Sequence, residues 1–113
     1  MEATAKIRYL RSTPRKARLV VDAVRGKNVS AALGLLEMTM PQKAAVDVAK
    51  LLKSAVANMQ SKHNEAAIDV DELRIAEIKV EEGPVLKRFR PCAHGRAARI
   101  IKHMCHISVT ISN

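Results

Sequence analysis

Hydrophobic and polar positions along the chain follow two different periods, and the changes between them predict its elements. Residues 5–11 nearly alternate between polar and apolar side chains, which is typical of a short strand with one buried face. Ser12-Thr13-Pro14 then supplies a hydroxyl cap followed by a proline in the first turn, which predicts a helix start. This helix should run to about Arg25 and stop at Gly26.

Two further helices are predicted in the middle of the chain. Ser30 can cap a short helix over residues 31–39, although Gly34 weakens that helix by roughly 1 kcal/mol relative to alanine. Pro41 opens a third and longer helix that ends near Asn64. Its apolar positions recur at spacings of three and four, as expected for one buried helical face: Ala44, Ala45, Val48, Leu51, Leu52, Ala55, Val56 and Met59.

The last third of the chain changes to a period of two. Apolar side chains stand at odd positions up to residue 75 and at even positions from residue 76. This change of phase by one residue predicts a bulge near 75–76. A second alternating segment covers residues 107–112, and the turn formers Gly83, Pro84, Pro91 and Gly95 lie between the two. We therefore predict one long β-hairpin over residues 72–112.

Together these elements predict an α+β fold, a small three-helix domain packed on a short sheet with one long protruding β-hairpin. The 113 residues form a single domain, with a globular part at about 1–72 and 104–113 and an arm at about 73–103. An isolated two-stranded ribbon is marginal in water, and about twenty residues of strand reach at most ~60 Å. Such an arm cannot bury itself in so small a domain, so we expect a partner to hold it.

Charge is segregated along the chain, whose formal net charge is +9. Residues 1–30 hold eight Lys or Arg and two acidic residues, and residues 83–113 hold six and no acidic residue. The segment between them holds six basic and nine acidic residues. A surface built for solubility mixes the two signs, so two separate basic blocks indicate a polyanionic partner.

The candidate RNA-binding residues are the cations of the two basic blocks together with two histidines of the last third of the chain. Phe89 lies between two arginines, which favours stacking on nucleotides over burial in a core. The full candidate set is Lys6, Arg8, Arg11, Arg15, Lys16, Arg18, Arg25, Lys27, Lys87, Arg88, Arg90, His94, Arg96, Arg99, Lys102 and His106.

Other classes of function fit the sequence less well. Cys and His residues of the arm suggest zinc or a Cys–His nucleophile, but no Cys-x2-Cys pair exists and no orienting third group is implied. We expect no metal, no cofactor, no small-molecule substrate and no enzymatic activity. The two cysteines, Cys92 and Cys105, are typical of reduced thiols, and no signal peptide or membrane span is evident, which predicts a cytoplasmic protein.

Two binding classes remain as alternatives. Three short helices could contain a helix-turn-helix that reads DNA, but helix 31–39 carries no Lys or Arg and only Glu37 as a charge. A membrane-surface protein needs cations opposite a strongly apolar helical face, whereas the basic blocks here lie on predicted strands, turns and a modest first helix.

Several motifs, in order along nearly the whole chain, resemble the bacterial large-subunit ribosomal protein L twenty-two family. Residues 12–20 (Ser-Thr-Pro-Arg-Lys-Ala-Arg-Leu-Val) and 24–27 (Val-Arg-Gly-Lys) resemble its opening, and 53–58 (Lys-Ser-Ala-Val-Ala-Asn) its third helix. Its hairpin is matched by Glu82-Gly83-Pro84, Lys87-Arg88-Phe89-Arg90-Pro91, Gly95-Arg96-Ala97 and His106-Ile107.

The resemblance implies a structural role in the large ribosomal subunit. It implies a globular part near the exit of the nascent-peptide tunnel and a hairpin that runs through ribosomal RNA with its tip lining the tunnel. The expected partners are large-subunit ribosomal RNA, neighbouring ribosomal proteins and the nascent peptide, with Lys87, Arg88, Phe89, Arg90 and Pro91 in the tip region. The chain departs from the family where Cys92 and His103 replace residues that are usually arginine.

Overall fold

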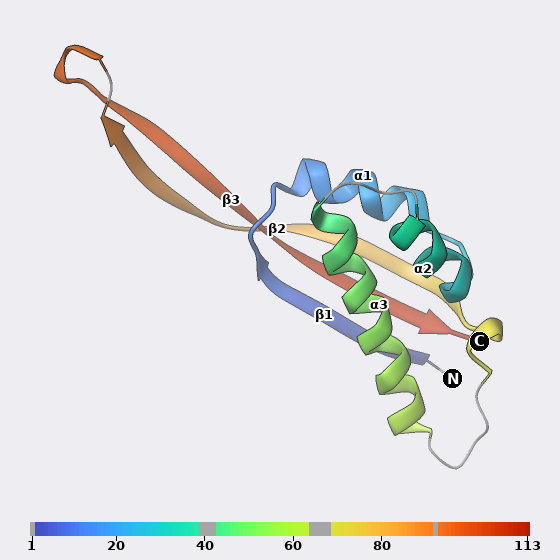
Figure 1. The fold of residues 1–113 in the computed structure, drawn as a ribbon. Coiled ribbons are helices and arrows are strands. Elements are labelled where there is room, and N and C mark those ends of the chain that lie inside the picture. The colour runs from blue at the N-terminus through green and yellow to red at the C-terminus, as the bar shows by residue number, and fades with distance from the viewer. Residues whose placement is uncertain (1, 39–42, 64–68, 92) are drawn as a thin grey trace.

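Three helices cover one face of a three-stranded antiparallel sheet, and a hairpin of two of its strands continues far beyond them (Figure 1). This computed structural model describes residues 2–38, 43–63, 69–91 and 93–113. The strand order is β1-β3-β2, so the predicted α+β fold with a protruding hairpin is confirmed. The elements are β1 Glu2–Leu10, α1 Pro14–Val24, α2 Val29–Met38, α3 Lys43–Lys62, η1 Val70–Glu72, β2 Arg74–Pro91, η2 Ala93–Gly95 and β3 Ala97–Ser112.

The first helix begins and ends where its sequence signals predict. Thr13 is the N-cap, and its hydroxyl accepts a hydrogen bond from the backbone N–H of Lys16 at 3.4 Å. Pro14 is the first helical residue, where its missing N–H leaves no donor unsatisfied. At the other end Gly26 adopts a φ of +79°, a left-handed conformation that suits glycine and reverses the chain.

The second helix begins earlier than predicted, directly after Asn28, which is also a residue type favoured as a cap, and a tertiary contact supports this start. Ser30 does not cap this helix; it lies inside α2, and its hydroxyl donates to the Asp71 carboxylate at 2.9 Å. The N–H of Val29 donates to the carbonyl of Leu73 at 3.0 Å, which fixes the helix start against the base of β2. The predicted start of the third helix at Pro41 and its end near Asn64 lie outside the described residues.

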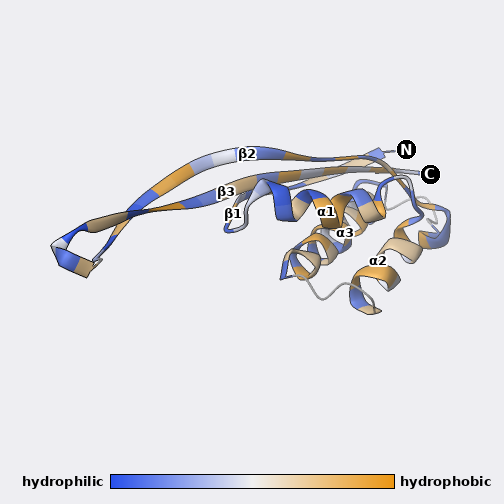
Figure 2. Ribbon diagram, turned by 90° about the horizontal axis from the view of Figure 1, so that it is seen from above, coloured by the Kyte–Doolittle hydropathy of each residue, from blue (hydrophilic) through white to orange (hydrophobic). Residues whose placement is uncertain are grey.

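The core is a single aliphatic layer between the helices and the sheet, as the absence of tryptophan and the scarcity of other aromatic residues predict. Figure 2 shows the helices on one side of the sheet. Leu52 and Met59 of α3 are fully buried, as are Ile107 and Ile111 of β3. Cys105 is also buried there, and this burial raises the pKa of its thiol, with Asp47 adding to the rise and Arg18 opposing it.

Side chains of α3 form hydrogen bonds with the β1 edge of the sheet. On β1, the carbonyl of Thr4 accepts a hydrogen bond from the Asn58 amide at 3.0 Å, and that of Glu2 accepts one from Lys62 at 3.3 Å. Asn58, a member of the third-helix motif, therefore ties α3 to the sheet edge. Satisfying these carbonyls protects an edge strand that could otherwise pair with another chain.

Two bulges shape β2, one predicted and one not. Its pairing with β3 shifts by one residue between Ile75 and Glu77, so the bulge predicted near 75–76 is confirmed. A second shift occurs between Glu82 and Val85, so Gly83-Pro84 lies inside the strand and is not a turn. A Cβ on Gly83 would lie 3.2 Å from the Met104 backbone, so this close approach of two strands favours glycine.

Beyond the second bulge the hairpin leaves the domain. The molecule measures 66 × 27 × 16 Å and has a radius of gyration of 17.3 Å, against about 13 Å for a compact domain of this length. The chain reverses at Ala93–Gly95, where His94 adopts a φ of +63°. In the described part of the chain, no helix is both long enough and apolar enough to span a membrane.

Shortening the arm should leave the domain folded. None of the described residues between 87 and 101 is buried, so removing them deletes no core contact. Leu86 and Lys102 are cross-strand partners, so an Asn-Gly turn can replace residues 87–101 and join them directly. We expect the free energy of unfolding to change by less than about 1 kcal/mol, as for surface changes generally.

Chemical denaturation followed by circular dichroism measures this effect, and the full-length chain is the reference. Loss of the helical signal in the shortened protein would show that the arm contributes to the core and would contradict the reading of the arm as a separate extension.

Candidate nucleic-acid interface

Three segments that are distant in sequence meet where the arm leaves the domain. They line a hollow of about 530 Å³, here called the neck hollow, with residues from the β1–α1 connection, α1, α3 and β3. Among the described residues lining it, none is acidic. Its charged or titratable members are Arg11, Lys16, Lys43, Lys102 and His103.

The neck hollow has the character of a phosphate site. Arg11, Lys16 and Lys102 were predicted to bind RNA, and the fold brings these three together. The start of α1 faces the same region, and a helix N-terminus favours negative charge. Exposed Ile101 adds an apolar surface that a sugar or base can contact.

A second concave surface lies on the other side of His103. Arg15, Lys16 and Arg18 of α1 contribute to it, with Glu82 of β2 as its acidic member. Its floor includes Leu19, which is 61% exposed although it is a large apolar side chain. The first turns of α1 and the base of the arm therefore form one continuous basic region.

Two predicted RNA-binding residues also hold the fold together. Arg18 donates a hydrogen bond to the carbonyl of Val80 at 3.4 Å, and Arg25 donates one to that of Ile78 at 3.0 Å. Both carbonyls belong to β2, so α1 is fastened to that strand by guanidinium groups. Arg25 also pairs with Asp22. Lys27 contributes its backbone, whose carbonyl accepts from the N–H of Ile75 at 3.1 Å.

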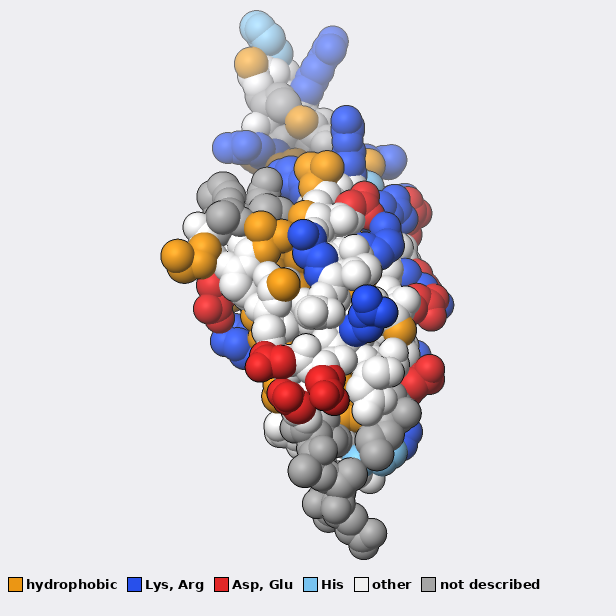
Figure 3. Space-filling view, turned by 90° about the vertical axis from the view of Figure 1, so that its right-hand side faces the viewer, with side chains coloured by type: hydrophobic (Ala, Val, Ile, Leu, Met, Phe, Trp, Pro, Cys, Tyr) orange, Lys and Arg blue, Asp and Glu red, His pale blue; other side chains and the backbone are white. Residues whose placement is uncertain are grey.

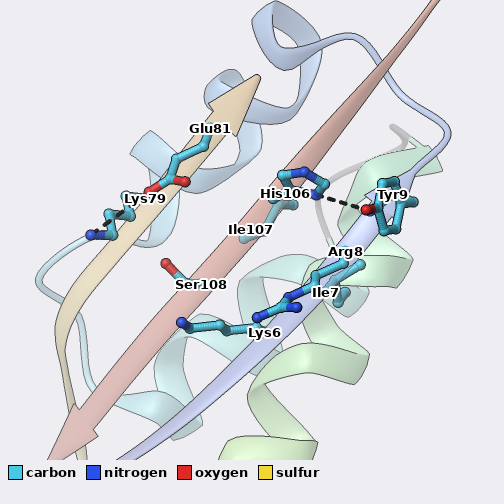
Figure 4. Close-up of a pocket in the computed structure, with 9 residues that line it drawn as sticks. All are labelled: Lys6, Ile7, Arg8, Tyr9, Lys79, Glu81, His106, Ile107 and Ser108. Atoms are coloured by element: carbon cyan, nitrogen blue, oxygen red, sulfur yellow. Dashed lines mark hydrogen bonds and ion pairs between the residues drawn. The ribbon is translucent and has the colours of Figure 1, made fainter. Parts of the chain in front are cut away.

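Lys6, Arg8 and His106 lie together on the open face of the sheet, which the helices do not cover (Figure 4). They line a hollow of about 320 Å³ with Tyr9 and Lys79, here called the sheet-face hollow. Lys79 forms the ion pairs at this hollow: its ammonium lies 3.8 Å from the carboxylates of Glu77 and Glu81.

The remaining predicted residues lie along the arm and are exposed. Lys87–Pro91, the predicted tip region, form the last five residues of β2 and lead to the turn. Phe89 is 72% exposed, and a shallow hollow of about 320 Å³ lies beside it, lined by Arg90 and Arg96. Arg88, His94 and Arg99 are likewise exposed.

The Cys and His residues of the arm do not converge in the described part of the chain. Cys105 points into the core, and His106 lies on the opposite, open face. Among the described residues, no group of three His, Cys, Asp or Glu is placed to hold a metal ion. Cys92 lies outside the described residues.

Charge is also segregated in space. Figure 3 shows acidic side chains gathered at the near end of the domain, with Lys and Arg prominent toward the arm behind it. Asp69, Asp71 and Glu72, around η1, contribute to the acidic end. A polyanion is therefore attracted to the arm and its base and repelled from the opposite end.

Sequence reasoning did not identify Lys43, Lys79 or Tyr9 as members of these sites. Lys43 belongs to α3, whose sequence shows only a core helix, and it joins the neck hollow through packing alone. Tyr9 lies in an alternating segment that predicts an inward ring, and no local signal marks the bulge that turns it outward.

A helix-covered sheet with a long basic arm and several cation-lined hollows is typical of a protein that binds a polyanion such as a nucleic acid. The family model described as Ribosomal protein L22p/L17e matches residues 5–112. A relative from Syntrophotalea carbinolica, the large ribosomal subunit protein uL22, is 55% identical over 112 residues, covering 99% of this chain and 98% of the relative. The chain belongs to this ribosomal protein family.

Proposed function

We propose that this protein binds and organises large-subunit ribosomal RNA during assembly, as a structural constituent of the large subunit of the cytoplasmic ribosome. Family membership supports the ribosomal role. The observation that carries RNA binding is the arm, which has no acidic residue from Gly83 onward and no buried described residue between 87 and 101. An arm of this kind is stabilised by contacts with a polyanion.

The neck hollow is the proposed anchor for the RNA backbone. Its Lys and Arg side chains come from three distant segments of the chain, so a phosphate in the hollow can contact several of them at once. Neutralising phosphates releases counterions, which is the main source of sequence-independent affinity for nucleic acid. The arm then follows the RNA from this anchor, with Phe89 available for stacking on a base.

The position of the arm tip is a further part of the proposal. We propose that residues 87–91 line the nascent-peptide tunnel and that the helical domain sits near the tunnel exit, beside other large-subunit proteins. The length of the arm and the exposure of its end support this placement. In this arrangement the nascent peptide passes the tip, and the arm acts by its position.

Charge reversal in the neck hollow tests the proposal. Lys16→Glu combined with Lys102→Glu should weaken binding of the full-length protein to large-subunit ribosomal RNA by at least about tenfold and reduce its salt dependence. Lys50→Glu combined with Lys53→Glu is the matched control, because it makes the same change in net charge at two exposed residues of α3 that do not line the hollow.

Filter binding at several salt concentrations measures both effects, and circular dichroism verifies that each variant is folded. Equal affinities for the hollow variant and the control would show that overall charge, and not this site, determines binding.

A further inference from the structure

The chain has one tyrosine and one phenylalanine, and neither lies in the core. Tyr9 is 60% exposed and Phe89 is 72% exposed, whereas the buried core is built from aliphatic residues, Met59 and Cys105. Aromatic side chains bury more apolar area than most, so leaving both outside forgoes stabilisation of the core. Phe89 belongs to the arm, but Tyr9 lies on the domain itself, where burial was available.

A bulge in β1 turns Tyr9 outward. Ile7 pairs with Ile107 and Leu10 with Cys105, so Arg8 and Tyr9 together oppose His106. Tyr9 adopts a φ of +59°, in the left-handed region that a bulky side chain rarely occupies. Bulges of this kind re-aim side chains near functional sites. Leu10 packs against the core in the position that regular alternation gives to Tyr9.

His106 holds the ring of Tyr9 in place. The backbone N–H of Tyr9 donates to His106 Nδ1 at 3.0 Å. The two ring centroids are 5.0 Å apart with the planes perpendicular, so the rings form a corner of the sheet-face hollow (Figure 4). The exposure of Tyr9 leaves ring surface uncovered for another planar group.

Positive charge beside this corner is unbalanced. Glu81 is the one acidic residue among the described residues that line the hollow, and its carboxylate and that of Glu77 each lie 3.8 Å from the ammonium of Lys79. Lys6 and Arg8 line the same hollow, and among the described residues neither has an acidic partner within ion-pair distance. An exposed aromatic ring next to unpaired cations matches the two parts of a nucleotide, a planar base and a phosphate.

We propose that the sheet-face hollow binds one unpaired nucleotide of the ribosomal RNA, with its base stacked on Tyr9 and its phosphate held by Lys6 and Arg8. The inference rests on the proposed function, because it assigns this RNA a second contact on the face of the sheet away from the helices. The nucleotide is unpaired because a base inside a helix is stacked on both faces and cannot reach the ring.

Tyrosine fluorescence reports on this site alone, because the chain has no tryptophan and no other tyrosine. Titrating the full-length protein with large-subunit ribosomal RNA transcribed in vitro should quench that fluorescence as binding proceeds. Ultraviolet crosslinking with mass spectrometry should place an adduct on Tyr9, joined to a nucleotide that chemical probing shows to be unpaired.

Two substitutions separate stacking from structure. Tyr9→Leu should lower RNA affinity by about tenfold, since stacking on one base is worth that much or more. Tyr9→Phe keeps the ring at the same backbone angle and should retain wild-type affinity. If the leucine variant does not fold, Lys6→Gln with Arg8→Gln tests the phosphate contact, and we expect a loss of similar size.

The outcomes distinguish this inference from the function it rests on. Unchanged fluorescence together with equal affinity of Tyr9→Leu and wild type would overturn the stacked nucleotide, while salt-dependent binding by the rest of the protein would leave the proposed function intact. Quenching that needs a neighbouring ribosomal protein and not RNA would also overturn it. If the wild-type chain does not bind the RNA at all, both the stacked nucleotide and the proposed function are contradicted.

Discussion

Binding of this protein to large-subunit ribosomal RNA should weaken by about a thousandfold or more when salt rises from roughly 50 to 200 mM. The two basic blocks supply enough cations to contact at least six phosphates, and each contact adds about 0.7 to 0.9 to the slope of log affinity against log salt. Cations of the neck hollow and the arm face solvent, so their contacts with RNA respond fully to screening.

Titrations at several salt concentrations measure this slope, and the protein with residues 87–101 replaced by Asn-Gly is the informative comparison. It lacks Lys87, Arg88, Arg90, Arg96 and Arg99, so its slope should be shallower while binding through the neck hollow persists. A flat salt response of the full-length protein would contradict an electrostatic origin of affinity.

Alternation in the sequence was sufficient to predict the hairpin and one of its bulges. Both strands of the hairpin bury one face where they join the domain, and a one-residue slip moves every side chain to the other face. The residues that must be buried therefore determine the strand register, and their positions can be seen in the sequence. The phase change near residues 75–76 marks the register shift between Ile75 and Glu77. Outside the domain none of the described residues is buried, so the bulge at Gly83-Pro84 was predicted to be a turn.

Features set by tertiary contacts were not predictable in this way. The start of α2 is supported by a hydrogen bond between Val29 and Leu73, 44 positions apart in the numbering, which no local signal predicts. Asn28, a residue type favoured as a cap, precedes the observed start, but Ser30 is an equally good cap by sequence. The neck hollow likewise requires Lys43 and Lys102 to meet across the fold. Sequence showed which residues were basic, but only packing showed which of them converge.

The second large effect we expect is that the order of the arm depends on bound RNA. Ordering each residue of a chain costs about 1–2 kcal/mol in backbone entropy, and an isolated ribbon recovers little of it by burial. In the free protein, strand pairing beyond the domain is the only support for residues 85–98, none of which is buried where described. In the subunit, RNA contacts should supply the rest, as for segments that fold with a partner.

Amide hydrogen exchange of residues 85–98, compared between the free protein and the assembled large subunit, tests this most directly. The helix over residues 44–59 serves as the internal reference, because its buried face packs in the core. We expect fast exchange of the arm in the free protein, far below the protection of that helix, and strong protection in the subunit. An arm already as protected as the helix before RNA is added would contradict the account, since protein packing alone would then hold it.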